Sequence, residues 1–75
     1  MTDRLQSFHD WYHYGIRLLS ASGIADAKTD VWLLMEHVTG ITRSWYLLHA
    51  EEPMPADAAA EYSRLLTERS RRIPL

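Results

Sequence analysis

The chain has 75 residues, of which 47% are hydrophobic and 24% charged, and its formal net charge at pH 7 is −2. This length and composition predict one small folded domain and exclude a collagen-like or disordered chain. The absence of cysteine excludes disulfides, thiol nucleophiles and cysteine-based zinc sites, and it favours a cytoplasmic protein. The nearly balanced charge argues against nucleic-acid binding, and no apolar run approaches the ~18 residues of a membrane-spanning helix.

Apolar residues recur at helical spacing along the whole chain, which predicts an all-α fold. A first helix is expected over about residues 3–21, with Thr2 or Asp3 as its N-terminal cap. Its inner face is expected to consist of Leu5, Phe8, Tyr12, Ile16 and Leu19. Ser22 and Gly23 predict its end, because glycine readily adopts the left-handed conformation that closes many helices.

A second helix is expected to begin after an Asp26 cap and to end at about Thr39, closed by Gly40. Its predicted inner residues are Ala27, Val31, Leu34 and Val38, with Leu33 and Met35 widening the apolar face. Asp30 lies at the edge of this face, where an unpaired charge is costly. We therefore expect Asp30 to be structural and to pair with Arg43 just beyond the Gly40 turn.

Two further helices complete the prediction. A short third helix follows a Thr42 cap, with Leu47 and Leu48 facing inward. Pro53 and Pro55 interrupt the chain, and Pro55 is expected in the first turn of a fourth helix. The inner face of this helix is predicted to contain Ala58, Tyr62, Leu65 and Leu66. Short connections favour a small orthogonal or antiparallel bundle of four to five helices over residues 1–72, and residues 73–75 are expected to leave it.

Seven tryptophans and tyrosines are many large rings for so small a domain. They are Trp11, Trp32, Trp45, Tyr12, Tyr14, Tyr46 and Tyr62. Most are expected to fill the core, but one inward face cannot hold both members of the adjacent pair Trp45 and Tyr46. These two and Trp32 are therefore candidates for an exposed aromatic patch of the kind that anchors protein interfaces.

No arrangement of catalytic, cofactor-binding or metal-binding residues emerges. His9 and His13 stand four apart, a spacing that lets two imidazoles share a metal, but no third ligand occurs at helical spacing. We interpret them as half-exposed histidines. The serines lack the strained turn that exposes a nucleophile, and the glycines are too scattered to form a phosphate-binding loop.

Several of these residues also match a known family pattern. The matching residues are Ala21 to Ile24, Asp30, Leu33 to Gly40, Arg43, Leu47, Leu65 to Thr67, Arg69, and Pro74 with Leu75. In this pattern the chain resembles the N-terminal helical domain of the peptide-chain release factor glutamine methyltransferases, the HemK/PrmC family. The resemblance is continuous from Asp30 to Leu75, whereas residues 1–20 match only as an amphipathic helix. Arg72 replaces a usual glycine, and Pro55 replaces a usual serine or threonine cap.

The resemblance implies a helical bundle joined through a hinge to a Rossmann-like catalytic domain. In the family, that domain binds S-adenosylmethionine and methylates the glutamine of the Gly-Gly-Gln motif of release factors. Its glycine-rich loop and its Asn-Pro-Pro-Tyr motif do not occur in this chain. The resemblance therefore implies a non-catalytic recognition domain without a cofactor of its own, whose partners are a release factor and a catalytic domain in cis.

Two groups of residues follow from this interpretation. The predicted partner-binding residues are Trp32, Arg43, Trp45, Tyr46 and His49. The predicted interdomain or hinge residues are Arg69, Arg71, Arg72, Pro74 and Leu75, while Gly23 and Gly40 are expected to be structural. The arginines near the C-terminus also suit a solvated helix end, because cations are favourable there.

Two alternatives from other classes stay open at this point. The chain also suits a free-standing helical adaptor that binds other helical proteins or itself. A helix-turn-helix DNA-binding protein is disfavoured by the net charge and by the lack of a basic helix that carries base-reading side chains.

Overall fold

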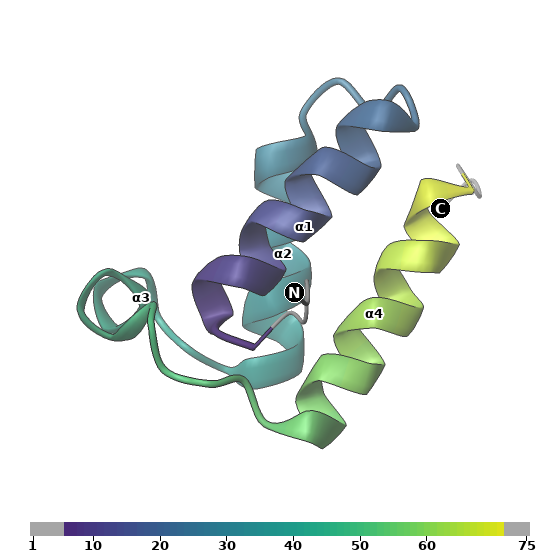
Figure 1. The fold of residues 1–75 in the computed structure, drawn as a ribbon. Helices are drawn as coiled ribbons and strands as arrows, with labels where there is room; N and C mark the ends of the chain where they lie inside the picture. Colours follow the sequence, from purple (N-terminus) through teal and green to yellow (C-terminus); the bar gives the residue numbers. More distant parts are fainter. Residues whose placement is uncertain (1–5, 72–75) are drawn as a thin grey trace, which may run out of the picture.

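Four helices follow one another in the computed structural model, which describes residues 6–71: α1 (Phe8–Ala21), α2 (Ala27–Thr39), α3 (Arg43–His49) and α4 (Ala56–Ser70) (Figure 1). Within these residues the β-type pairing is limited to one isolated bridge between Ser7 and Pro53. The predicted small all-α bundle is therefore confirmed. None of the helices in this part of the chain combines the length and the apolar character that crossing a lipid bilayer requires.

The start of α1 differs from the prediction. Ser7 is the N-cap: its Oγ accepts a hydrogen bond from the Asp10 amide at 3.0 Å, and Asp10 Oδ2 accepts one from the Ser7 amide at 3.2 Å. This reciprocal pair satisfies amides that a helix start leaves free, so the helix begins at Phe8 and the expected start at residue 3 is wrong. The proposed caps Thr2 and Asp3, and Leu5, lie outside the described residues.

The predicted ends of the first two helices are confirmed. α1 ends at Ala21, and Gly23 has a φ of 86°. Gly40 closes α2 with a φ of 73°, a conformation that disfavours any side chain. Asp26 occupies the N-cap position of α2, although its side chain makes no capping hydrogen bond.

The inner residues of α2 and α3 differ in part from the prediction. α2 buries Ala27, Val31 and Met35, whereas Leu33 is 55% exposed and does not widen the core. α3 turns Tyr46 inward, and the prediction that Leu47 and Leu48 face the core is wrong, because they are 75% and 81% exposed. Thr42 caps α3 as expected, with its Oγ1 accepting from the Trp45 amide at 3.0 Å.

α4 begins one residue later than predicted. Pro55 occupies the N-cap position and Ala56 is the first helical residue, so the proline precedes the first turn rather than forming part of it. Tyr62 and Leu66 are buried as predicted, while Ala58 and Leu65 are only half-buried.

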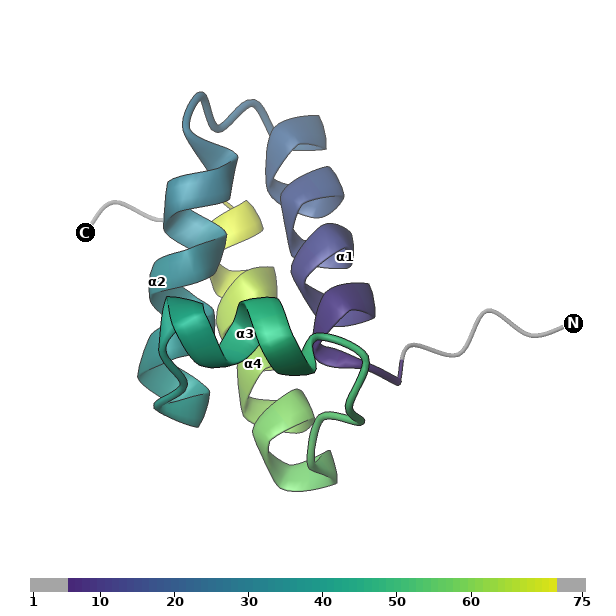
Figure 2. The same cartoon turned by 90° about the vertical axis from the view of Figure 1, so that its left-hand side faces the viewer.

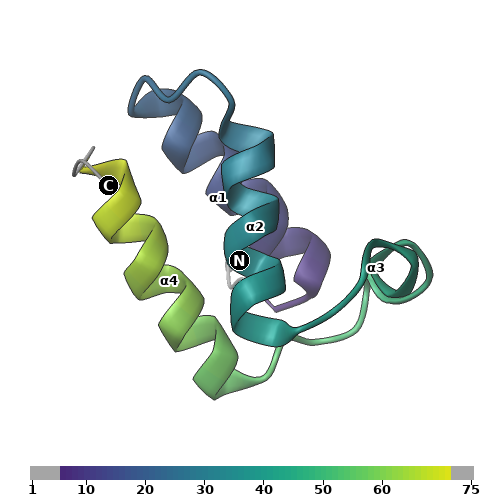
Figure 3. The ribbon, with the colours of Figure 1, turned by 180° about the vertical axis from the view of Figure 1, so that it is seen from behind.

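The core lies between α1, α2 and α4, which pack against one another, while α3 lies across one side of the bundle (Figures 1 and 2). Seen from behind, α4 runs alongside the other two long helices (Figure 3). The large side chains without any exposure are Leu19, Val31, Met35, Tyr62 and Leu66. The Tyr62 hydroxyl donates a hydrogen bond to the Trp11 carbonyl at 2.9 Å and so satisfies its polar atom inside the core.

α1 and α4 approach each other closely at Gly15. A Cβ atom on this residue would lie 2.7 Å from the Tyr62 hydroxyl oxygen, 3.0 Å from Val31 Cγ1 and 3.2 Å from Leu66 Cδ2. The glycine therefore provides the space that the packed helices require.

A backbone clasp joins the start of α1 to the segment before α4. It consists of three hydrogen bonds, from the Phe8 amide to the Glu52 carbonyl at 3.0 Å, from the His9 amide to the Ala50 carbonyl at 2.9 Å and from the Met54 amide to the Gln6 carbonyl at 2.8 Å. The clasp anchors the segment that carries α3 to the bundle.

Candidate functional site

An aromatic cluster on α1, α2 and α3 forms the best-defined surface feature among the predicted site residues. The rings of Tyr12, Trp32 and Tyr46 contact one another edge to face, with centroids 5.4 to 6.2 Å apart. The guanidinium of Arg43 lies over Trp32, 4.6 Å from its ring centroid, and 5.9 Å from that of Tyr12. Aromatic faces attract cations at such distances, so the cluster holds the Arg43 side chain in place.

The five predicted partner-binding residues divide into two groups. In the aromatic cluster Arg43 is exposed and Trp32 is half-buried, but Tyr46 is only 8% exposed and serves as a core residue instead. Its burial raises the pKa of the Tyr46 hydroxyl. Trp45 and His49 stack on each other on α3 with centroids 4.7 Å apart. His49 Nδ1 lies 2.7 Å from Glu52 Oε2, and the Trp45 ring also packs edge to face against Phe8.

The predicted pair of Asp30 and Arg43 is wrong. Asp30 Oδ2 accepts hydrogen bonds from Arg69 Nη2 at 2.8 Å and from Arg69 Nε at 3.2 Å. Asp30 lies on the side of α2 that faces α4, so its charge meets the end of α4 rather than the start of α3. Arg69 therefore connects α4 to α2 through this ion pair, and Arg43 instead contacts the rings of the aromatic cluster.

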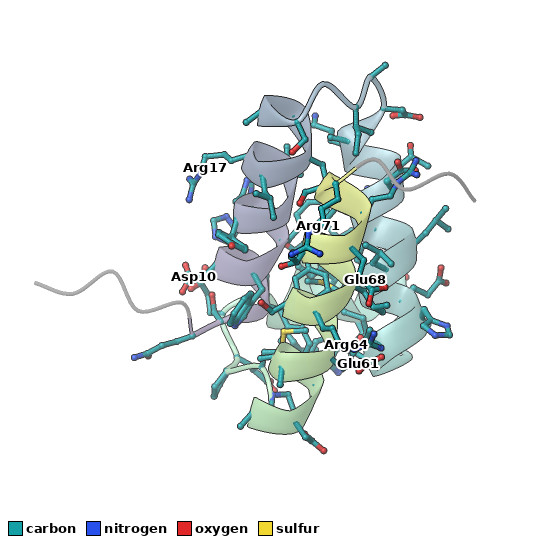
Figure 4. The ribbon with its side chains drawn as sticks, turned by 90° about the vertical axis from the view of Figure 1, so that its right-hand side faces the viewer. Asp10, Arg17, Glu61, Arg64, Glu68 and Arg71 are labelled. Atoms are coloured by element: carbon teal, nitrogen blue, oxygen red, sulfur yellow. The ribbon has the colours of Figure 1, made fainter. Side chains whose placement is uncertain are left out.

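The ion pair of Asp30 and Arg69 is expected to stabilise the fold more than the exposed pairs of α4. Its side chains are only 25% and 28% exposed, so replacing Arg69 with glutamine leaves Asp30 poorly solvated and is expected to cost about 1–3 kcal/mol of unfolding free energy. Arg64, 55% exposed, pairs with Glu61 and Glu68 on the outer side of α4 (Figure 4). As the control, Arg64→Gln is expected to lower the unfolding free energy measured in urea much less than Arg69→Gln does, because exposed ion pairs contribute little. Equal costs for the two variants would contradict the prediction.

Of the remaining predicted hinge residues, Arg71 lies at the end of α4. Arg71 is exposed and is the C-cap of this helix. Arg72, Pro74 and Leu75 lie outside the described residues. The docking or hinge role of this group stays a prediction.

His9 and His13 lie side by side on α1, with ring centroids 4.3 Å apart. The pKa of His13 is lowered by partial desolvation and, to a smaller extent, by the nearby charges of His9, Arg17 and Lys28. In residues 6–71 no group of three or more histidine, aspartate or glutamate side chains is placed to hold a metal ion.

Lys28 also lies at the candidate site, although no sequence pattern predicted it. It lines a shallow hollow of about 430 Å³ together with Arg43, Trp32, Tyr12, Leu33, Thr29 and Asp26. The available signal was its position one helical turn before Trp32, which places the two side chains on neighbouring positions of α2. A wider hollow of about 570 Å³ lies between the start of α1 and α4, and none of the predicted partner-binding residues lines it.

Comparison with known proteins agrees with the family resemblance that residues 30–75 show. The chain is 35% identical over 57 residues to proteins named release factor glutamine methyltransferase from Deinococcus radiodurans and from Cereibacter sphaeroides. Each match covers 76% of this chain and 20% of the relative, so the chain spans about a fifth of the length of these relatives. No solved structure matches the chain significantly. The family model described as the PrmC N-terminal domain matches residues 10–75, and the chain therefore belongs to the PrmC N-terminal domain family.

Proposed function

We propose that this chain is the recognition domain of a protein-(glutamine-N5) methyltransferase and that it binds a peptide-chain release factor. The observation that carries the proposal is family membership, together with the names of the relatives. The exposed surface of the aromatic cluster supplies a contact area of suitable chemistry, because tryptophan and arginine are enriched where proteins bind each other.

The proposed mechanism is positional. A domain that holds the release factor away from the reacting amide contributes binding energy that orients this amide beside the catalytic domain. In the cytoplasm, where translation termination takes place, such a domain would act in cis with the catalytic part of the parent protein. We place the methyl-transfer chemistry in that part.

We place the S-adenosylmethionine site outside this chain, and the charge of the hollow beside Trp32 supports this placement. Two cations, Lys28 and Arg43, line the hollow beside Trp32, where they would repel the positively charged sulfonium group. The glycines of this chain also stand singly rather than in a phosphate- or nucleotide-binding loop. No step of the reaction is therefore routed through this chain, and the proposal places the cofactor in the catalytic domain.

Calorimetric titration of the 75-residue chain tests the proposal. We expect a purified release factor to bind with a dissociation constant in about the micromolar range, as is typical of small transient interfaces. We expect S-adenosylmethionine to give no heat of binding. A cofactor signal, or the absence of release-factor binding, would overturn the proposal, and a dimer of the free chain in sedimentation would favour the adaptor alternative.

A further inference from the structure

Among the described residues, Arg43 has no charged partner that holds it in place. Its guanidinium lies over the Trp32 ring, and within residues 6–71 the structure gives it neither an ion pair nor a hydrogen bond. A guanidinium carries five N–H donors in a planar fork that matches the two oxygens of a carboxylate. The Trp32 indole therefore fixes the Arg43 side chain, and the N–H donors of the guanidinium stay available for a ligand.

The surroundings of Arg43 combine positive charge with exposed apolar surface. Lys28 lines the same hollow, so two cations face one carboxylate, Asp26, in a chain whose formal net charge is −2. Leu33, more than half exposed, and Trp32 provide the apolar part of the lining. Figure 2 shows the backbone of the helices that carry these residues, with α3 lying across α1 and α2 and with α4 behind them.

The contrast with α4 strengthens the argument. Arg64 is neutralised by Glu61 and Glu68, and Arg69 is neutralised by Asp30. Figure 4 shows Glu61, Arg64 and Glu68 together on the outer side of that helix. Thus Arg64 and Arg69 have carboxylate partners from the chain itself, whereas none of the carboxylates in residues 6–71 forms an ion pair with Arg43.

We infer that the hollow beside Trp32 is a receptor for a carboxylate side chain in an acidic segment of the release factor, bound by Arg43 and Lys28. The inference rests on the proposed function and names the chemistry of its contact. Arg43 binds the carboxylate with two parallel hydrogen bonds, Lys28 adds a second positive charge, and an apolar residue beside the carboxylate packs on Trp32 and Leu33. Because the stack on Trp32 already restricts Arg43, binding costs less side-chain entropy than it would for a freely moving arginine.

An acidic protein segment suits this face better than a nucleic acid does. A nucleic-acid backbone requires a row of cations along one face, whereas here two cations converge on one hollow and a carboxylate stands at its edge. A hollow of about 430 Å³ admits one or two side chains, which is the scale of a peptide anchor.

Titration of a release factor into variants of the 75-residue chain tests the inference. We expect Arg43→Gln to weaken binding roughly tenfold to hundredfold, as is usual for the loss of a charge-assisted bidentate contact. Arg43→Lys is expected to lose most of the same affinity, because an ammonium group lacks the planar fork. The matched control is Arg17→Gln, which removes the same charge from an exposed position of α1 outside the hollow and is expected to change the affinity less than about twofold. Far-UV circular dichroism of each variant verifies that it is folded.

The carboxylate partner is found by a second set of titrations. Each aspartate and glutamate of the release factor is changed singly to the corresponding amide. The affinity of each release-factor variant is then measured for the wild-type chain and for the Arg43→Gln chain. The expected result is one carboxylate whose loss weakens the wild-type complex at least about fivefold but leaves the Arg43→Gln complex unchanged.

The outcomes separate the two proposals. If the wild-type chain does not bind the release factor, the proposed function fails and the inference fails with it. If the wild-type chain binds but Arg43→Gln binds equally well, the proposed function stands and the carboxylate receptor is overturned. It is also overturned if a single-stranded DNA oligonucleotide competes for the hollow, or if Arg17→Gln weakens binding as much as Arg43→Gln does, since diffuse charge would then explain the contact.

Discussion

Replacing Leu66 with alanine is expected to leave a large fraction of the chain unfolded at 25 °C. Leu66 on α4 has no exposed surface and lies among the residues that join the three packed helices. Removing a fully buried leucine side chain costs about 2–5 kcal/mol, because the cavity that remains adds to the lost hydrophobic transfer energy. A domain of this size has only roughly 3–5 kcal/mol of stability to lose. Urea unfolding followed by far-UV circular dichroism measures the change.

The matched control for this truncation is Leu48→Ala. Leu48 is also a helical leucine, but it is 81% exposed on α3. Its truncation is expected to alter the unfolding free energy by less than about 0.5 kcal/mol. If Leu48→Ala destabilised the chain as much as Leu66→Ala, the inward face of α3 would have to be reassigned.

Placing valine at position 15 is expected to destabilise the chain by about 3 kcal/mol or more. The added Cβ would lie 2.7 Å from the Tyr62 hydroxyl oxygen on α4 and 3.0 Å from Val31 Cγ1 on α2, so α1 would have to move away from both helices. Ser20→Val introduces the same β-branched residue at an exposed position of α1 and is expected to cost less than about 1 kcal/mol. Thermal and urea unfolding of the two variants give the comparison.

A smaller change at the same position identifies the atom that causes the crowding. Gly15→Ala adds only the Cβ, and its better helix propensity offsets up to about 1 kcal/mol of the clash. In a Tyr62→Phe background, which lacks the hydroxyl oxygen nearest to that Cβ, the alanine is expected to be less costly than in the wild type. Strictly additive costs of the two substitutions would show that the hydroxyl is not the limiting contact.

Helix boundaries were largely predictable from the sequence where short-range chemistry decides them. Gly40 and the Thr42 cap act within three residues of their own positions, and both features occur as expected. The start of α1 was missed because Thr2 and Asp3 offered another cap, although Ser7 and Asp10 carry the reciprocal capping pattern in the sequence itself.

Contacts between distant segments were harder to predict. Asp30 and Arg69 are 39 positions apart, so no local spacing signals their pairing. The inward residue of α3 depends on how a seven-residue helix lies across the bundle, and this orientation places Tyr46 inward and Leu47 and Leu48 outward. Of the candidate site, Trp32 and Arg43 were found from their residue types, but their stacking on each other is a property of the folded chain.

The backbone clasp has a consequence for sequence change. Each of its three hydrogen bonds joins an amide to a carbonyl, so the side chains of Gln6, His9, Ala50 and Glu52 can be exchanged without breaking the connection. Proline breaks the clasp at positions 8, 9 and 54, because it has no amide hydrogen to donate. Pro53 is accepted one residue earlier, where no donor of the clasp is needed. Relatives can therefore vary widely in this segment and still hold the short third helix in the same position.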